Sequence, residues 1–121
     1  LEGNTKTCDF AGLNTTYDLM LIDGDYSYER VKHDTEQVFK HLVHDNSIVV
    51  WHDYAYNPEA IRYEVFKAIL DGTPKAFHKN LYHPQNTMCA LFTTENYKTS
   101  SFQSPKTPEY LFKVNLESNK F

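Results

Sequence analysis

Two short polar stretches carry the side chains best suited to chemistry. The first is Asp23-Gly24-Asp25 and the second is His52-Asp53. Carboxylates are the preferred ligands of hard divalent cations, and an imidazole binds metals or exchanges protons near neutral pH. Each stretch directly follows a run of apolar residues. The elements that precede the two stretches therefore decide whether these groups meet.

Both apolar runs are typical of strands that are buried on two faces. Residues 17–23 and 47–51 are rich in Leu, Ile, Val and Met, and residues 28–43 between them repeat apolar side chains at helical spacing. The two strands of a strand–helix–strand unit run parallel. Ligands of open α/β sheets bind outside the carboxyl ends of such strands. We therefore expect Asp23 and Asp53 to emerge at one edge, close enough to share a ligand.

The rest of the chain completes an α/β layout. A second amphipathic helix is expected, with Asn57 as its N-cap, Pro58 as its first residue and Gly72 as a left-handed residue at its end. Residues 75–83 and 87–94 are joined by a turn and predict an antiparallel hairpin. The expected order is β-α-β-α-β-β, a parallel part with an antiparallel edge.

The last part of the chain differs in composition. Residues 95–108 are rich in Ser, Thr, Lys and Pro, which is typical of an exposed connector, and residues 110–117 alternate as in a strand. We expect one domain at residues 1–94, followed by a connector and tail strand at residues 95–121.

Composition excludes several classes of protein. The net charge of −4 and the lack of a basic run argue against nucleic acid as a partner. No apolar stretch approaches the roughly 20 residues that span a bilayer, so we expect no membrane partner. Cys8 and Cys89 are expected to be free thiols in a reducing compartment, which predicts a cytoplasmic protein; a single bridge between them is the alternative.

Each candidate residue also has a structural interpretation. Asp23 and Asp53 also suit turns and helix starts, and Asp25 also suits stabilisation of the following helix, for which Ser27 is the expected N-cap. His52 also suits a hydrogen-bonded position on the rim. The remaining histidines of the first helix region are expected to be solvated; they are His33, His41 and His44.

Three motifs resemble one enzyme family. The segments YDLMLIDGDYSYE at 17–29, VKHD at 31–34 and VWHDY at 50–54 are similar to class I S-adenosylmethionine-dependent methyltransferases. The similarity is greatest to the branch with IDGDHSYE and VWHDY patterns. It covers about residues 3–94 and implies the C-terminal half of a Rossmann-like methyltransferase sheet, in which the last hairpin is antiparallel.

The resemblance implies a cofactor and a reaction. The cofactor is S-adenosylmethionine, and the residues expected to border it are Asn4, Asp23, Gly24, Asp25 and Tyr26. The reaction is transfer of a methyl group to a small molecule, with a hydroxyl as the expected acceptor.

The resemblance also implies a divalent cation, expected to be Mg²⁺. Its ligands would be Asp23 and Asp53, with His52 as a third ligand or as the catalytic acid/base. Bound metal lowers the pKa of a substrate hydroxyl and orients its oxygen. Tyr26 stands where the family usually has a histidine and is the second catalytic candidate.

The chain departs from the family in one major respect. It has four glycines and no G-x-G sequence, so the Gly-rich loop that grips the cofactor is not among its residues. We expect the C-terminal half of a larger methyltransferase, without tight cofactor binding by itself; a degenerate relative is the alternative.

Two other functions stay open. Asp23-Gly24-Asp25 also fits the D-x-D metal–diphosphate site of a sugar-nucleotide transferase. A non-catalytic half-domain is the second alternative, in which the exposed sheet edge and the tail strand serve assembly into a homo-oligomer.

Overall fold

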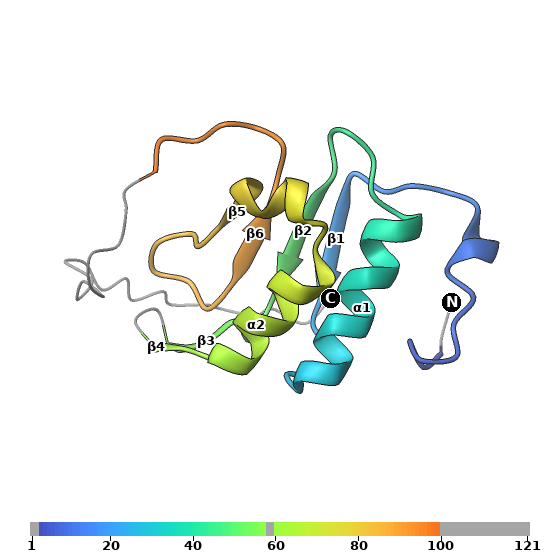
Figure 1. The fold of residues 1–121 in the computed structure, drawn as a ribbon, viewed down its shortest axis with the longest axis horizontal. Coiled ribbons are helices and arrows are strands. Elements are labelled where there is room, and N and C mark those ends of the chain that lie inside the picture. Colours follow the sequence, from blue (N-terminus) through green and yellow to red (C-terminus); the bar gives the residue numbers. More distant parts are fainter. Residues whose placement is uncertain (1–2, 58–59, 100–121) are drawn as a thin grey trace, which may run out of the picture.

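A computed structural model describes residues 3–57 and 60–99 of the 121-residue chain (Figure 1). The predicted tail strand at 110–117 lies outside the described residues, so the division of the chain at residue 94 stays a prediction. Within the described ranges, no helix combines the length and the apolar content needed to cross a membrane.

A four-stranded mixed sheet lies at the centre of the fold. Its strands, in spatial order, are β1 (Leu19–Ile22), β2 (Ile48–Trp51), β6 (Ala90–Phe92) and β5 (Leu81–Tyr82). β1 and β2 are parallel, and β6 is antiparallel to both of its neighbours, β2 and β5 (Figure 1). The parallel pair and the antiparallel hairpin predicted from the sequence are therefore confirmed.

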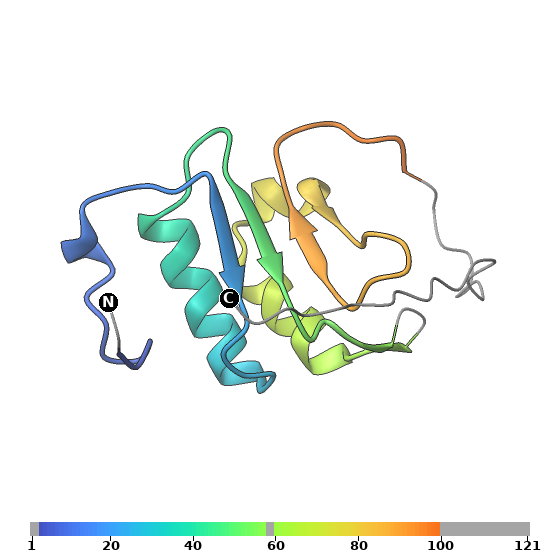
Figure 2. The same cartoon turned by 180° about the vertical axis from the view of Figure 1, so that it is seen from behind.

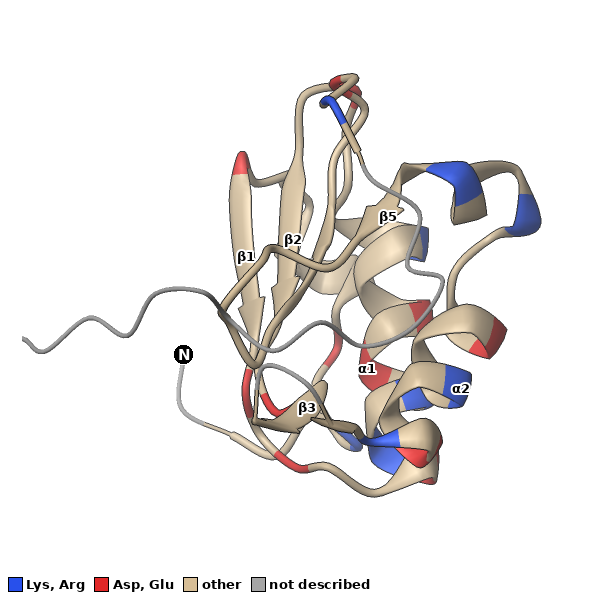
Figure 3. Ribbon diagram, turned by 90° about the vertical axis from the view of Figure 1, so that its left-hand side faces the viewer, with Lys and Arg blue, Asp and Glu red and all other residues tan. Residues whose placement is uncertain are grey.

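Two helices cover the same face of this sheet. α1 (Tyr28–His41) and α2 (Tyr63–Gly72) pack against each other on one side of the strands (Figure 3). Side chains of a strand alternate between faces, so Met20 and Ile22 are buried beneath α1, whereas Leu19 and Leu21 are 66% and 63% exposed. No helix or strand of the described ranges covers the opposite face (Figure 2).

An aromatic cluster fills the space between the sheet and the helices. Trp51 and Phe92 are fully buried, and Phe39 of α1 lies 4.9 Å from the Phe92 ring and 6.3 Å from the Trp51 ring. The Trp51 Nε1–H donates a hydrogen bond of 2.9 Å to Thr35 Oγ1, so its polar atom is satisfied. Burying each large side chain contributes about 1.5–3 kcal/mol. Trp51 therefore belongs to the core.

The segment after β2 differs from the prediction. Asn57 does not cap a helix: it ends β3 (Ala55–Asn57), which pairs with β4 (Ala60–Ile61) in a small antiparallel ribbon. α2 begins only after Arg62. Two backbone hydrogen bonds hold this stretch extended, from Ala55 N–H to Met88 O and from Arg62 N–H to Tyr54 O. These tertiary contacts outweigh the local capping signal.

The last hairpin is also shorter than predicted. Lys75–Asn80 forms a 3₁₀ helix in place of the first part of a strand. Phe77 in this turn lies 5.9 Å from the Phe39 ring, and the Asn80 side chain donates to Thr93 O. The packing of Phe77 against Phe39 therefore accompanies a helical turn in a segment that was predicted to be a strand.

Gly72 does not have the predicted left-handed conformation, because no described glycine has positive φ. Its role is in packing. A Cβ at this position would lie 2.8 Å from Thr35 Cβ and 2.9 Å from Lys32 O. The absence of a side chain therefore allows α2 to approach α1 closely.

Gly72→Ala should lower the free energy of unfolding by about 1–2 kcal/mol, since overpacking exceeds the gain in helix propensity. Urea denaturation measures this change. Gly24→Ala is the matched control, because nothing lies within 4 Å of its added Cβ. Equal unfolding midpoints for the two variants would contradict the close-approach role.

Candidate metal and cofactor site

The candidate site lies where β1 and β2 end. Ile22 and Trp51 are paired in register as the last residues of their strands, and His52 N–H donates to Ile22 O at 3.0 Å. Because the strands are parallel and in register, the residues that follow them leave the sheet side by side. Asp23 and His52 are those residues.

Three metal-capable side chains meet at this point. His52 Nδ1 lies 3.1 Å from Asp23 Oδ1 and 3.4 Å from Asp53 Oδ2. One donor atom of each residue lies within 4.8 Å of the others, and no other such group forms among the described residues. The prediction that Asp23 and Asp53 meet at a common edge is confirmed.

The geometry of the trio Asp23, His52 and Asp53 fits a small cation. His52 Nδ1 is buried, yet neither carboxylate contact has hydrogen-bond geometry, so this atom has no directed partner. Buried ring nitrogens are ordinarily hydrogen-bonded. An octahedral Mg²⁺ with ligands at about 2.1 Å separates its donors by roughly 3–4 Å, which is compatible with the spacing here. Two carboxylates and one imidazole can hold Mg²⁺ or Mn²⁺, with water completing the shell.

Asp53 has a left-handed backbone, with φ of 56°. Only a few per cent of non-glycine residues have positive φ, and Asp and Asn are the types that tolerate it best. With this backbone conformation, two consecutive residues, His52 and Asp53, both place a donor atom within 4.8 Å of one of Asp23. Backbone strain of this kind often accompanies functional sites.

Cys89 lies within the electrostatic field of the trio. Burial raises the pKa of the Cys89 thiol, and the negative charges of Asp23 and Asp53 raise it further. The pairing of Trp51 with Ala90 brings this part of the chain beside the site. The sequence carried no local signal for this neighbour, because it depends on the insertion of β6 beside β2.

Asp25 stabilises the start of α1. Its Oδ1 accepts a 2.7 Å hydrogen bond from Ser27 N–H, and this bond together with the nearby Arg30 guanidinium lowers the pKa of Asp25. Ser27 occupies the predicted N-cap position but forms no side-chain capping bond. The carboxylate of Asp25 therefore interacts with Ser27 and Arg30 and is not part of the trio.

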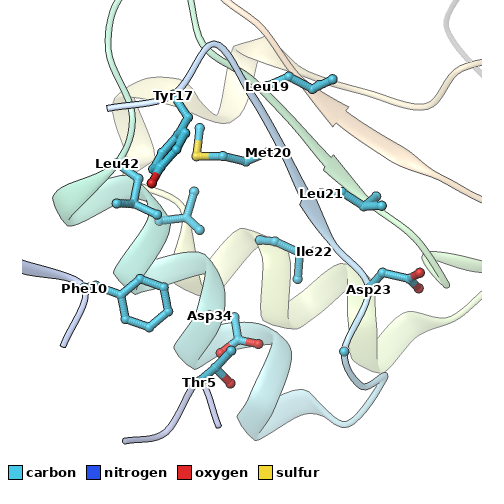
Figure 4. Close-up of a pocket in the computed structure, with 12 residues that line it drawn as sticks. Thr5, Phe10, Tyr17, Leu19, Met20, Leu21, Ile22, Asp23, Asp34 and Leu42 are labelled. Atoms are coloured by element: carbon cyan, nitrogen blue, oxygen red, sulfur yellow. The ribbon is translucent and has the colours of Figure 1, made fainter. Parts of the chain in front are cut away.

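Asp23 and Gly24 border a hollow of about 330 Å³ beside β1 (Figure 4). Asp34 of α1 also lines it, is only 9% exposed, and leaves Oδ1 without a hydrogen-bond partner. Thr5 and Phe10 of the N-terminal segment close another side (Figure 4). The hollow therefore joins one end of the trio to the free edge of the sheet.

The structure does not bring every predicted residue to the trio. Asn4 lies in the N-terminal segment, where its Oδ1 accepts a hydrogen bond from Lys6 N–H at 3.0 Å. Tyr26 is 57% exposed and its ring packs on Arg62. His33 contacts Thr5 O through its ring. Roles for Asn4 and Tyr26 toward a cofactor therefore stay predictions.

The comparison with protein families finds one similarity, over less than half of the chain. Residues 2–54 match the family described as Methyltransferase domain. This segment contains β1, α1, β2 and all three residues of the trio. No curated protein and no solved structure matched the chain.

The mixed α/β fold agrees with that match. Residues 2–54 are therefore similar to a methyltransferase domain. The branch of the family and the assignment to a C-terminal half stay predictions.

Reactivity of Cys89 should report cation binding without any assay of activity. Mg²⁺ at the trio would offset the charges that raise the Cys89 pKa, so more thiolate would form and alkylation at mildly alkaline pH should accelerate several-fold. Mass spectrometry of the Cys89 peptide measures the rate, with Cys8 as the internal reference.

Asp53→Asn is the matched variant, because Asn also tolerates the left-handed backbone. It should speed alkylation of Cys89 in the absence of metal and reduce the response to Mg²⁺. A Cys89 rate that Mg²⁺ leaves unchanged in the unmodified chain would count against a cation at the trio.

Proposed function

We propose that this chain takes part in S-adenosylmethionine-dependent methyl transfer to a hydroxyl group of a small molecule, assisted by Mg²⁺. The observation that carries the proposal is the meeting of Asp23, His52 and Asp53 at the ends of two parallel strands, within the segment that matches a methyltransferase domain. Ligand sites at this edge of a parallel sheet are the rule for α/β folds.

The three residues of the trio would have different roles in such a site. Asp23 and Asp53 would hold the cation, since carboxylate oxygens are its preferred ligands. When bound, the cation lowers the pKa of a coordinated hydroxyl. His52 lies between both carboxylates, where it supplies a third donor or accepts the proton of the acceptor as a general base.

The cofactor would lie beside the loop that follows β1. Gly24, Asp25 and Tyr26 are exposed there. No heavy atom lies within 4 Å of the position that a Cβ on Gly24 would take, so a ligand can approach the backbone at this residue. The 121 residues contain no G-x-G loop to hold the rest of the cofactor. Binding by this chain alone should therefore be weak.

The D-x-D alternative has less support. A metal–diphosphate site needs both carboxylates of Asp23-Gly24-Asp25 on one ion. Asp25 is instead engaged by Ser27 N–H and Arg30, and it is not part of the trio. The partner of Asp23 is a residue from the neighbouring strand end, which favours the methyltransferase assignment.

Titration with S-adenosylmethionine, followed by ¹⁵N NMR, tests the cofactor position. We expect saturable shifts of the Gly24, Asp25 and Tyr26 amides with an affinity weaker than micromolar, because much of the cofactor would stay in water. ATP serves as the control for nonspecific binding of an adenine nucleotide.

Two outcomes would contradict these expectations in different ways. A micromolar dissociation constant would show that the chain binds the cofactor without a Gly-rich loop. Shifts confined to other residues, or equal shifts with ATP, would overturn the placement of the cofactor beside β1.

A second candidate function is assembly through β1. Leu19 and Leu21 are 66% and 63% exposed on a strand whose other edge has no partner strand among the described residues. Unpaired edges pair readily with another strand. We propose that a second copy of the chain pairs there, β1 against β1 across a twofold axis, so that the leucines of both strands lie side by side on the uncovered face of a continuous sheet.

Replacing Leu19 and Leu21 together by Lys should convert such a dimer to a monomer, measured by light scattering after size exclusion. The substitution Tyr63→Lys is the control, because Tyr63 is 79% exposed on α2, away from β1. A monomeric unmodified chain, or a dimer that survives the double substitution, would rule out this interface.

A further inference from the structure

Two tyrosine rings lie against the guanidinium of Arg62, the residue that directly precedes α2. Its Cζ is 3.8 Å from the centre of the Tyr56 ring and 4.8 Å from that of Tyr26. Both tyrosines are more than half exposed, at 63% and 57%, so the stack is at the surface. The backbone fixes its base, because Arg62 N–H donates to Tyr54 O at 2.9 Å.

Among the described residues, the guanidinium of Arg62 has no acidic partner. No carboxylate of the described residues lies within ion-pair distance of it, and its buried Nε has no hydrogen-bond partner. Arg30, the other arginine of the chain, pairs with Asp25 at 3.3 Å. A charged group held in place but unpaired is a candidate for binding a ligand.

Stacking leaves the hydrogen-bonding capacity of an arginine free. An aromatic ring contacts a face of the planar guanidinium, whereas the N–H donors of the two terminal nitrogens lie in its plane. Cation–π contacts hold the group in one orientation. A guanidinium fixed in this way offers a preorganised fork to a carboxylate or phosphate, which accepts two parallel hydrogen bonds.

The stack also spans the two loops that carry the trio. Tyr26 follows Asp23 by three residues, and Tyr56 follows Asp53 by three residues. Arg62 therefore joins the loop after β1 to the β3–β4 ribbon after β2. The stack is therefore connected to both strand ends of the trio by three residues of chain on each side.

We propose that Arg62, held against the rings of Tyr26 and Tyr56, binds an oxyanion, either a carboxylate or a phosphate, carried by the small molecule that reaches the trio. The identity of that molecule as a methyl acceptor rests on the proposed function. Binding of the oxyanion does not, since it needs neither the cofactor nor turnover.

The side-chain Nε–H signals of the two arginines provide a direct test. The full chain, without added divalent cation, is titrated with benzoate, with phenyl phosphate, and with benzyl alcohol as the uncharged control. We expect the Arg62 signal to shift saturably with at least one anion and the Arg30 signal to stay in place. The anion that binds more tightly identifies the group as carboxylate or phosphate.

Two lysine variants distinguish specific binding of the anion by the Arg62 guanidinium from nonspecific attraction by a positive charge. Arg62→Lys keeps the charge but loses the planar fork, and should weaken binding at least about tenfold. Arg30→Lys should leave the affinity unchanged. Equal shifts with benzyl alcohol, no shift with either anion, or full affinity in Arg62→Lys would each overturn the inference.

The outcome is independent of the proposed function. Methyl transfer to an uncharged acceptor, with no anion binding at Arg62, would leave that function intact and remove this inference. Anion binding without any response to S-adenosylmethionine would support the oxyanion site and count against the methyltransferase assignment.

Discussion

The in-register parallel pairing of β1 and β2 is the constraint on which the rest of the structure depends. Ile22 and Trp51 end their strands at the same level, and His52 N–H continues the ladder to Ile22 O. A shift of one residue would turn each side chain to the opposite face. The carboxylate of Asp23 and the imidazole of His52 would then no longer meet, and Trp51 would leave the aromatic core.

Packing on only one face of the sheet connects the core to the site. The buried set of β1 and β2 faces α1 and α2, and the bond from Trp51 to Thr35 ties the second strand to the first helix. The close crossing of the helices at Gly72 fixes α2. Since α2 follows Arg62 directly, the same packing positions the tyrosine–arginine stack.

Three features of the molecule lie along β1. Leu19 and Leu21 face outward, the hollow with buried Asp34 follows the strand, and Asp23 ends it. An apolar strand with an unpaired edge is costly in water, which is why native sheets usually cover it. Among the described residues, the candidate site and the unpaired edge of the sheet therefore both belong to β1 and the loop that follows it.

The sequence by itself determined the parallel strand–helix–strand unit, the antiparallel last hairpin and the meeting of Asp23 with Asp53. These follow from hydrophobic periodicity and chain connectivity, which are local or topological. Only the tertiary structure decided the β3–β4 ribbon, the 3₁₀ turn at Phe77, the position of Cys89 and the stacking of Arg62. Each of these depends on contacts between segments far apart in the chain, whose energies outweigh local propensity and leave no periodic signal in the sequence.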